Sequence, residues 1–241
     1  MKTVGIIGGS GVYSLGDDAK KKKLNGIEYL VEELDDKKLI FVPRHGLKHQ
    51  YLASEVPHTK NFNVLKKENV EAILAFSSVG CLDKEIEIKK GVFILPNDYI
   101  RGFSSRIDFL KLKTHPDMSR PFDNKLIWYA AEAIMENGYS VFEEGIYIYS
   151  GGNCFETKAE ISFLRALAKL SYLEKGLVVG LTAVPEIILA KENKIPYALV
   201  CIPVNYGTGI AENPTHEHTL KMIKENEEPI KKIISSFCRK L

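Results

Sequence analysis

The sequence alternates between two hydrophobic patterns from one end to the other. Short and nearly unbroken apolar runs are typical of strands that are covered on both faces. Such strands are expected at Val4–Ile7, Ile27–Val31, Leu39–Val42, Ala72–Phe76, Val92–Leu95, Gly145–Tyr149, Leu177–Val179 and Pro196–Ile202. Apolar residues at helical spacing predict helices at Lys60–Asn69, Phe122–Ile134, Pro185–Asn193 and Leu220–Phe237, the last kinked or split at Pro229. The alternation predicts a single α/β domain over residues 1–241.

Local signals add detail to several of these elements. Thr157 and Glu160 have the spacing of a capping box, so a further helix is expected to begin there. Pro96 is expected to end the strand before it, because proline donates no hydrogen bond to a sheet. The polar stretch Glu32–Lys38 predicts a turn between two strands. The basic run Lys20–Lys23 is expected to be a solvated loop or a sheet edge rather than a binding patch.

Composition and charge exclude several classes of protein. The 33 Lys and Arg residues nearly balance the 31 Asp and Glu residues, and a net charge of +2 gives no reason to expect nucleic acid as a partner. No apolar run approaches the ~20 residues needed to cross a bilayer, and Val4–Ile7 is too short for a signal peptide. The cysteines at 81, 154, 201 and 238 are too far apart for a Cys-x-x-Cys motif, which predicts free thiols. We expect a soluble, cytoplasmic protein.

Four places where a strand meets a loop carry groups that suit an anion. They are Gly8–Gly11 with Ser10, the pair Arg44-His45, the run Ser77-Ser78-Val79-Gly80 where a strand runs into a turn, and Thr182 after the strand Leu177–Leu181. Each alone is better explained by a tight turn or a structural pair. Together they offer amides, hydroxyls and a guanidinium without a carboxylate, which favours phosphate. A dinucleotide fingerprint fails, because Ser14 stands where its third glycine is needed.

A second group of residues suits a flat heterocycle. Phe155 offers a stacking face beside the Glu156 carboxylate, and Asn205 follows the strand Tyr197–Pro203. The alternative is a core phenylalanine, a surface glutamate and a turn-forming asparagine. The histidines at 115, 216 and 218 are further polar candidates, but nothing in the sequence has metal-ligand spacing with a clear third partner.

Five ordered motifs resemble those of the trimeric purine nucleoside phosphorylases, in particular the methylthioadenosine phosphorylase branch. The resemblance covers nearly the whole chain. The motifs are Gly5-Ile6-Ile7-Gly8-Gly9-Ser10-Gly11-Val12-Tyr13, Val42-Pro43-Arg44-His45-Gly46-Leu47-Lys48-His49, Ser77-Ser78-Val79-Gly80, Phe155-Glu156-Thr157-Lys158-Ala159-Glu160 and Leu181-Thr182-Ala183-Val184-Pro185-Glu186.

The resemblance implies phosphorolysis of a purine nucleoside to free purine and ribose 1-phosphate, on a mixed and partly barrel-like sheet flanked by helices. It implies that phosphate is a co-substrate, with no metal or other cofactor, and that the protein is a trimer or a dimer of trimers. The implied phosphate ligands are Ser10, Arg44, His45, Ser77, Ser78 and Thr182; the implied purine ligands are Phe155, Glu156 and Asn205; the implied ribose ligands are Leu181, His115 and His216; and the implied catalytic residues are Asn205 and His45. His115 resembles the family's histidine that reaches a neighbouring subunit's site.

Departures from the family pattern bear on the substrate. The adenine-selective branch is expected to carry Asp-x-Asp where this chain has Asn205-Tyr206-Gly207, and an amide there suits a 6-oxopurine. Glu156 fits the same reading, since the 6-oxopurine enzymes of the family use a glutamate at the matching place. His216 aligns with a histidine that contacts the 5′-hydroxyl. These features favour inosine or guanosine, with methylthioinosine or methylthioadenosine as the alternative.

Two other departures and two rival functions stay open at this point. The loop Gly151–Cys154 and the segment His58–Asn61 replace more typical family sequences, which leaves room for altered specificity or reduced activity. One rival is a non-catalytic purine-binding protein that keeps the fold. The other is a dinucleotide-dependent oxidoreductase, which the failed glycine fingerprint disfavours.

Overall fold

The computed structural model describes residues 1–9, 19–102, 107–170, 175–211 and 216–241. Its strands are β1 (Lys2–Gly8), β2 (Lys20–Leu24), β3 (Ile27–Leu34), β4 (Lys37–Pro43), β5 (Ala72–Cys81), β6 (Val92–Arg101), β7 (Ser140–Tyr149), β8 (Leu177–Gly180) and β9 (Tyr197–Tyr206). Its helices are α1 (His58–Lys67), α2 (Asn124–Glu136), α3 (Lys158–Leu170), α4 (Ala183–Glu192), α5 (His216–Glu225) and α6 (Glu227–Lys240), with 3₁₀ turns η1 (Ala53–Glu55) and η2 (Asp108–Leu110).

The described strands form one mixed, nine-stranded sheet in the order β2-β3-β4-β1-β5-β8-β7-β6-β9. A further pairing of β5 with β9 joins the last strand back to the middle of the sheet. Five strands therefore make a partly closed ring, and β1, β4, β3 and β2 extend from it as an open sheet. The predicted α/β architecture with a partly barrel-like sheet is confirmed.

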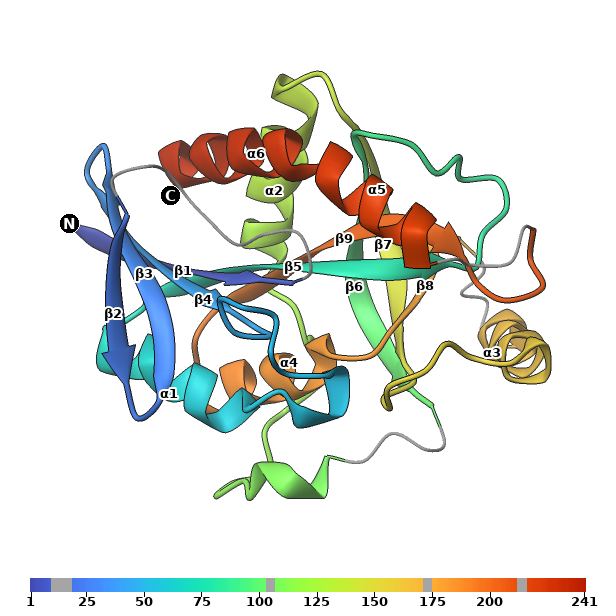
Figure 1. The fold of residues 1–241 in the computed structure, drawn as a ribbon, viewed down its shortest axis with the longest axis horizontal. Helices are drawn as coiled ribbons and strands as arrows, with labels where there is room; N and C mark the ends of the chain where they lie inside the picture. Colours follow the sequence, from blue (N-terminus) through green and yellow to red (C-terminus); the bar gives the residue numbers. More distant parts are fainter. Residues whose placement is uncertain (10–18, 103–106, 171–174, 212–215) are drawn as a thin grey trace.

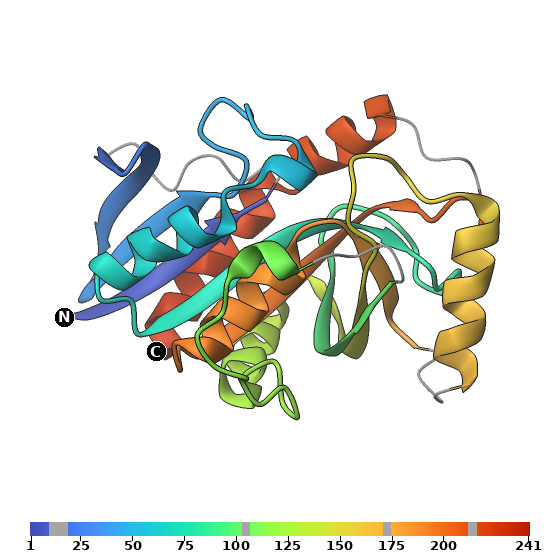
Figure 2. The same ribbon diagram turned by 90° about the horizontal axis from the view of Figure 1, so that it is seen from below.

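Helices cover both faces of the sheet. Figure 1 shows α2, α5 and α6 on one face and α1 with α4 on the other, and Figure 2 shows α3 set apart at the end of the ring. Helix α4 is the most deeply placed, because every residue from Ala183 to Ala190 is buried. The two ends of the chain lie close together, where Lys2 Nζ donates to the Leu241 carbonyl at 3.2 Å.

The run Lys20–Lys23 forms the edge strand β2, as the expectation of a solvated loop or sheet edge allowed, and its four exposed lysines protect that edge from pairing. Two other features differ from the sequence prediction. The turn between β3 and β4 is shorter than the predicted Glu32–Lys38. The two strands pair as far as Leu34 and Lys37, so only residues 35–36 remain in the turn. The expectation that the strand ends at Pro96 is wrong. Strand β6 passes through it, and the register with β7 shifts on both sides of Pro96, as is typical where a proline lies in a strand.

The helical predictions hold with small shifts at their ends. The capping box at Thr157 is present: Glu160 N donates to the Thr157 hydroxyl at 3.2 Å, and Thr157 N donates to the Glu160 carboxylate at 2.7 Å. The C-terminal helix is split, as Pro229 predicted, but the break falls at Asn226 and Pro229 sits in the first turn of α6. Proline is tolerated there because a first-turn N–H has no helical partner.

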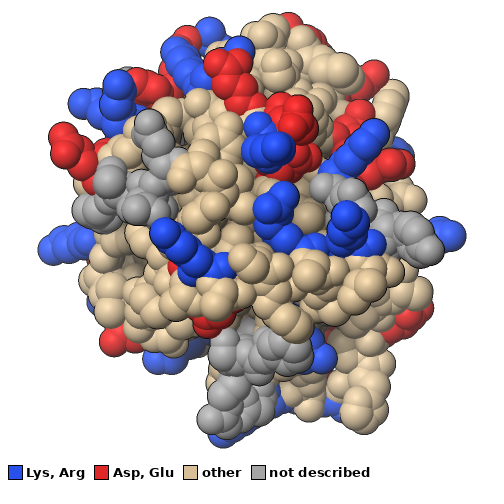
Figure 3. Space-filling view, turned by 90° about the vertical axis from the view of Figure 1, so that its right-hand side faces the viewer, with Lys and Arg blue, Asp and Glu red and all other residues tan. Residues whose placement is uncertain are grey.

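Within the described ranges, no helix is both long and apolar enough to span a bilayer. The face shown in Figure 3 has positive and negative side chains interspersed among uncharged surface, in keeping with the nearly balanced charge of the chain.

Candidate active site

The ends of neighbouring parallel strands bring the predicted anion ligands to one edge of the sheet. β1 and β4 are parallel and end together at Gly8 and Pro43, so Gly9 and Arg44 follow side by side. β5 and β9 are also parallel and run alongside them. Ser77 and Ser78 lie within β5, and Asn205 lies within β9, so the expectation that these residues follow their strands is wrong. A register shift after Val79 allows the two strands to continue.

Most of the predicted site residues line a single pocket at this edge. Its lining includes Arg44, His45, Ser77, Ser78, Phe155, Glu156, Leu181, Thr182 and Asn205. His115 does not belong to this lining, and it is exposed on the segment before α2. Ser10 and the side chain of His216 lie outside the described residues. The structure thus brings the predicted phosphate and purine groups together, while the binding roles of these residues stay predictions.

Two residues that the sequence analysis gave no role also line the pocket, Thr219 and Ile223 of helix α5. Gly9, from the glycine run predicted to suit an anion, lines it as well. A Cβ at position 9 would lie 2.7 Å from Arg44 Nη1 and 2.8 Å from the Phe76 carbonyl oxygen. Glycine is needed there because the guanidinium packs against its backbone.

Arg44 is buried and held by three hydrogen bonds. Its Nε and Nη2 donate to the two carboxylate oxygens of Glu186 at 2.5 and 2.8 Å, and Nη1 donates to the Phe76 carbonyl at 2.7 Å. Burial alone would lower the pKa of Arg44, but the Glu186 carboxylate outweighs it and holds that pKa above its ordinary value. Asn61 of α1 fixes the backbone by donating to the Arg44 carbonyl at 3.1 Å.

Glu186 is the functional residue that sequence reasoning missed most clearly. Arg44 was predicted to meet an anionic ligand, phosphate. The chain itself supplies one, from a position 142 residues away. A signal was present, because Glu186 is the one charged residue in the run Ala183–Ala190, and a carboxylate buried in such a helix needs a cation.

His45 is an uncharged acceptor at neutral pH. Its Nδ1 lies 2.9 Å from the Tyr51 carbonyl oxygen, which can only accept, so Nδ1 carries the proton. Burial and the nearby Arg44 charge lower the pKa of His45 to about 4. Its Nε2 then holds a lone pair and can accept a hydrogen bond rather than donate one.

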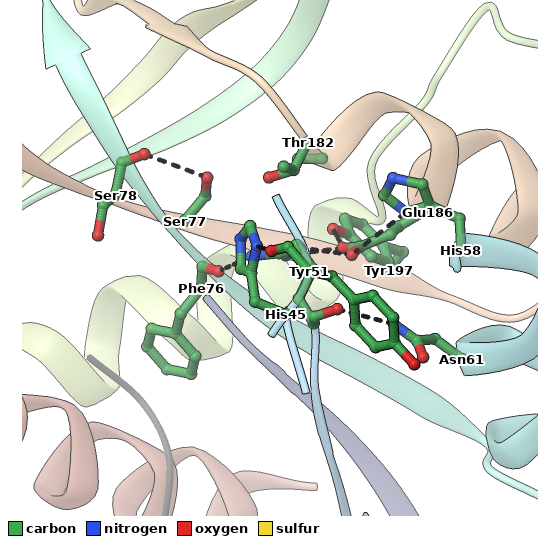
Figure 4. Close-up of polar contacts among 12 residues, drawn as sticks. His45, Tyr51, His58, Asn61, Phe76, Ser77, Ser78, Thr182, Glu186 and Tyr197 are labelled. Atoms are coloured by element: carbon green, nitrogen blue, oxygen red, sulfur yellow. Dashed lines mark hydrogen bonds and ion pairs between the residues drawn. The ribbon is translucent and has the colours of Figure 1, made fainter. Parts of the chain in front are cut away.

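Thr182 stands at the N-terminal end of α4, just after β8. The backbone N–H groups of Thr182 and Ala183 both donate to the Tyr147 hydroxyl at 3.3 Å. These two amides are therefore occupied, and the Thr182 hydroxyl is the group left to meet a ligand. Figure 4 shows Thr182 between Ser77 and Ser78 on one side and Glu186 and His58 on the other.

The groups suited to a heterocycle belong to the same pocket lining. Ser150 donates through its hydroxyl to Glu156, which holds that carboxylate in place. The Asn205 amide donates to the Tyr206 carbonyl at 2.8 Å, which fixes its plane. Phe155 is 49% exposed, so its ring is free to cover a bound molecule. In the described part of the chain, no group of three or more His, Cys, Asp or Glu residues is arranged to hold a metal ion.

A partly closed mixed sheet with hydroxyls, a guanidinium, a carboxylate and an amide around one pocket is the arrangement expected from the resemblance to nucleoside phosphorylases. The sequence profile of the phosphorylase superfamily matches residues 3–239, and the chain belongs to this family. Phosphorylases of this family use inorganic phosphate as a co-substrate and need no other cofactor.

Several relatives are similar over nearly their whole length. A probable S-methyl-5′-thioinosine phosphorylase of Methanocaldococcus jannaschii is 33% identical, over 97% of this chain and 91% of the relative. An S-methyl-5′-thioadenosine phosphorylase of Pyrococcus abyssi is 31% identical, over 100% and 93%. A probable 6-oxopurine nucleoside phosphorylase of Moorella thermoacetica is 30% identical, over 96% and 90%.

The same fold occurs in a solved structure of a more distant relative. Methylthioadenosine phosphorylase from Schistosoma mansoni, in complex with adenine, superposes with a TM-score of 0.83 over 99% of this chain and 91% of that one, at 22% identity.

Proposed function

We propose that this phosphorylase cleaves 6-oxopurine nucleosides, with S-methyl-5′-thioinosine as its preferred substrate. The observation that carries the proposal is the single pocket in which Glu156 and Asn205 lie with Ser77, Ser78 and Thr182. The pocket therefore offers groups suited to a purine and groups suited to a phosphate.

Hydrogen bonding within the chain supports a 6-oxopurine. The Glu156 carboxylate can accept several hydrogen bonds, and Ser150 supplies one of them. The carboxylate can therefore also accept from the N1–H that a 6-oxopurine offers. One Asn205 N–H is engaged by Tyr206, and the other can donate to N7 or to the 6-carbonyl. Adenine has a lone pair at N1 instead of a proton. Its N1 and the Glu156 carboxylate would both be acceptors and could form no hydrogen bond with each other.

Phosphate is both ligand and nucleophile in the proposed reaction. The C1′–N9 bond breaks with its electron pair passing to the purine, and a phosphate oxygen then bonds to C1′. Ser77, Ser78, Thr182 and the free N–H groups of Arg44 orient the phosphate, so positioning supplies much of the rate. Asn205 stabilises the charge that gathers on the departing purine, and His45 accepts a hydrogen bond from a protonated phosphate oxygen.

The preferred sugar of the nucleoside is inferred more from the names of the relatives than from the residues of the pocket. Two of the three relatives described above bear names of 5′-methylthio nucleoside phosphorylases. The second candidate is inosine or guanosine phosphorolysis, the function first favoured by the sequence. It is supported by the polar Thr219 in the pocket lining and by the 6-oxopurine phosphorylase of Moorella thermoacetica.

We further propose that the protein acts in the cytoplasm as a trimer or a dimer of trimers. The four cysteines are free thiols, which suits a reducing compartment. His115 is exposed and away from the pocket lining of its own chain, as a residue that serves a neighbouring subunit would be.

A panel of five nucleosides tests the proposal. Purified protein is incubated with methylthioinosine, inosine, guanosine, adenosine or methylthioadenosine, with and without inorganic phosphate, and free purine is measured by chromatography. We expect cleavage only with phosphate, and the highest kcat/KM for methylthioinosine. A higher value for inosine supports the second candidate, a preference for either adenine nucleoside refutes the base assignment, and no cleavage at all refutes the enzyme.

A further inference from the structure

The Arg44 guanidinium is held along one edge and left partly open along the other. Of its five N–H groups, those on Nε and Nη2 that face Glu186 are used, and one on Nη1 is used by Phe76. One N–H remains on each terminal nitrogen. Nη1 is also the atom that packs against Gly9 of the pocket lining. The orientation of the two remaining N–H groups is therefore set by the Glu186 carboxylate together with the Phe76 carbonyl.

Tyr197 is the group that fixes Glu186 in turn. Its hydroxyl donates to Glu186 Oε2 at 3.0 Å, the same oxygen that accepts from Arg44 Nη2 at 2.8 Å. Burial raises the pKa of Tyr197 well above its ordinary value, so the hydroxyl keeps its proton and remains a donor. The other oxygen, Oε1, accepts from Arg44 Nε, and His58 Nδ1 is too far from it to bond, at 3.8 Å.

All three residues of this chain of contacts are deeply buried. The exposed fractions of Arg44, Glu186 and Tyr197 are 1%, 4% and 2%. Among the residues drawn in Figure 4, Tyr197 and Glu186 lie beside one another, on the side opposite Ser77 and Ser78. Neither residue is part of the pocket lining, so both would influence a ligand only through Arg44.

We propose that Glu186 and Tyr197 are positioning residues for phosphate, which hold the open edge of Arg44 toward the phosphate site. The inference rests on the proposed function, because it takes phosphate as the ligand. Glu186 also neutralises the Arg44 charge, so Arg44 contributes oriented donors rather than a free positive charge. An arginine that is already fixed loses little side-chain freedom when the anion binds, and this pre-organisation favours binding.

Direct phosphate binding tests the proposal without depending on catalysis. Isothermal titration with inorganic phosphate gives the Kd of the wild-type protein, of Tyr197→Phe and of Glu186→Gln. We expect Kd to rise about fivefold in Tyr197→Phe and about tenfold or more in Glu186→Gln, because a partner that orients a ligand group is commonly worth about tenfold or more. The phosphate KM should rise in parallel, with the KM for nucleoside nearly unchanged.

The matched control is Tyr29→Phe. The Tyr29 hydroxyl also donates to a glutamate, Glu68 Oε1 at 2.6 Å, and the ring is also buried, but neither residue lies in the pocket lining. We expect this variant to lose stability and to bind phosphate as the wild type does.

The outcomes separate this proposal from the proposed function. A phosphate Kd within twofold of wild type in Tyr197→Phe overturns the positioning role, even if Glu186→Gln fails to fold. A wild-type protein that does not bind phosphate overturns it as well. A wild-type protein that binds phosphate, with the expected change in the variants, but cleaves no nucleoside leaves the positioning role standing and refutes the proposed function.

Discussion

Acid should destabilise this protein through His58, and replacing that residue should remove much of the effect. His58 begins α1 and is 4% exposed, and its Nδ1 has no hydrogen-bond partner. Burial and the nearby Arg44 charge lower the pKa of His58 from 6.5 to about 3. The Glu186 carboxylate 3.8 Å away does not reverse this, since it is already paired with Arg44.

The sign and size of the effect follow from proton linkage. Because the folded pKa is lower than the unfolded value of 6.5, the unfolded chain takes up the proton first as the pH falls. The stability present above pH 6.5 is then lost progressively down to about pH 3. The loss is about 1.4 kcal/mol per pH unit, or about 3 kcal/mol near pH 4.5.

The test compares wild type with His58→Phe by urea unfolding near pH 8 and near pH 4.5, at one protein concentration. Phenylalanine keeps a flat ring beside Phe109, whose ring centre lies 6.0 Å from that of His58, and it carries no proton-binding nitrogen. Between pH 8 and pH 4.5, we expect the free energy of unfolding to fall by about 3 kcal/mol less in the variant than in the wild type. Equal losses in wild type and His58→Phe would refute the reasoning.

Three further substitutions probe the site. Asn205→Asp should shift the inosine-to-adenosine kcat/KM ratio toward adenosine, since a carboxylate accepts from a 6-amino group; an unchanged ratio would show that Asn205 does not read the base. Gly9→Ala should destabilise by about 1–3 kcal/mol, because its Cβ would meet Arg44 and the Phe76 carbonyl; urea unfolding checks this, and an unchanged midpoint would contradict the packing. Arg44→Ala should cost about 3–5 kcal/mol by leaving Glu186 buried without its cation, and wild-type stability in the same assay would show that the pair is not coupled.

The fold was largely predictable because each buried strand leaves a local apolar signal. The runs at Val4–Ile7 and Ala72–Phe76 have no polar interruption and correspond to the centres of β1 and β5. Features that depend on pairing were not predictable in this way. The passage of β6 through Pro96 relies on a register shift against β7, and the ring depends on β5 meeting β9.

The residue types of the site were predictable from the sequence, but the hydrogen bonds and ion pairs between them were less so. Arg44, Ser77, Thr182 and Asn205 were identified as polar groups near strand ends, and one pocket contains them all. The partner of Arg44 was not identified, because the ion pair joins segments 142 residues apart. The same is true of the Tyr147 hydroxyl, which occupies the amides at the start of α4.

The central claim is that one pocket holds phosphate beneath a purine nucleoside. A crystal structure of the protein soaked with phosphate and hypoxanthine tests this most directly. The account predicts an oxyanion within hydrogen-bond distance of Ser77, Thr182 and the open edge of Arg44, with the purine between Phe155 and Asn205. Clear density for these side chains with no anion among them, or with the purine bound elsewhere, would contradict it.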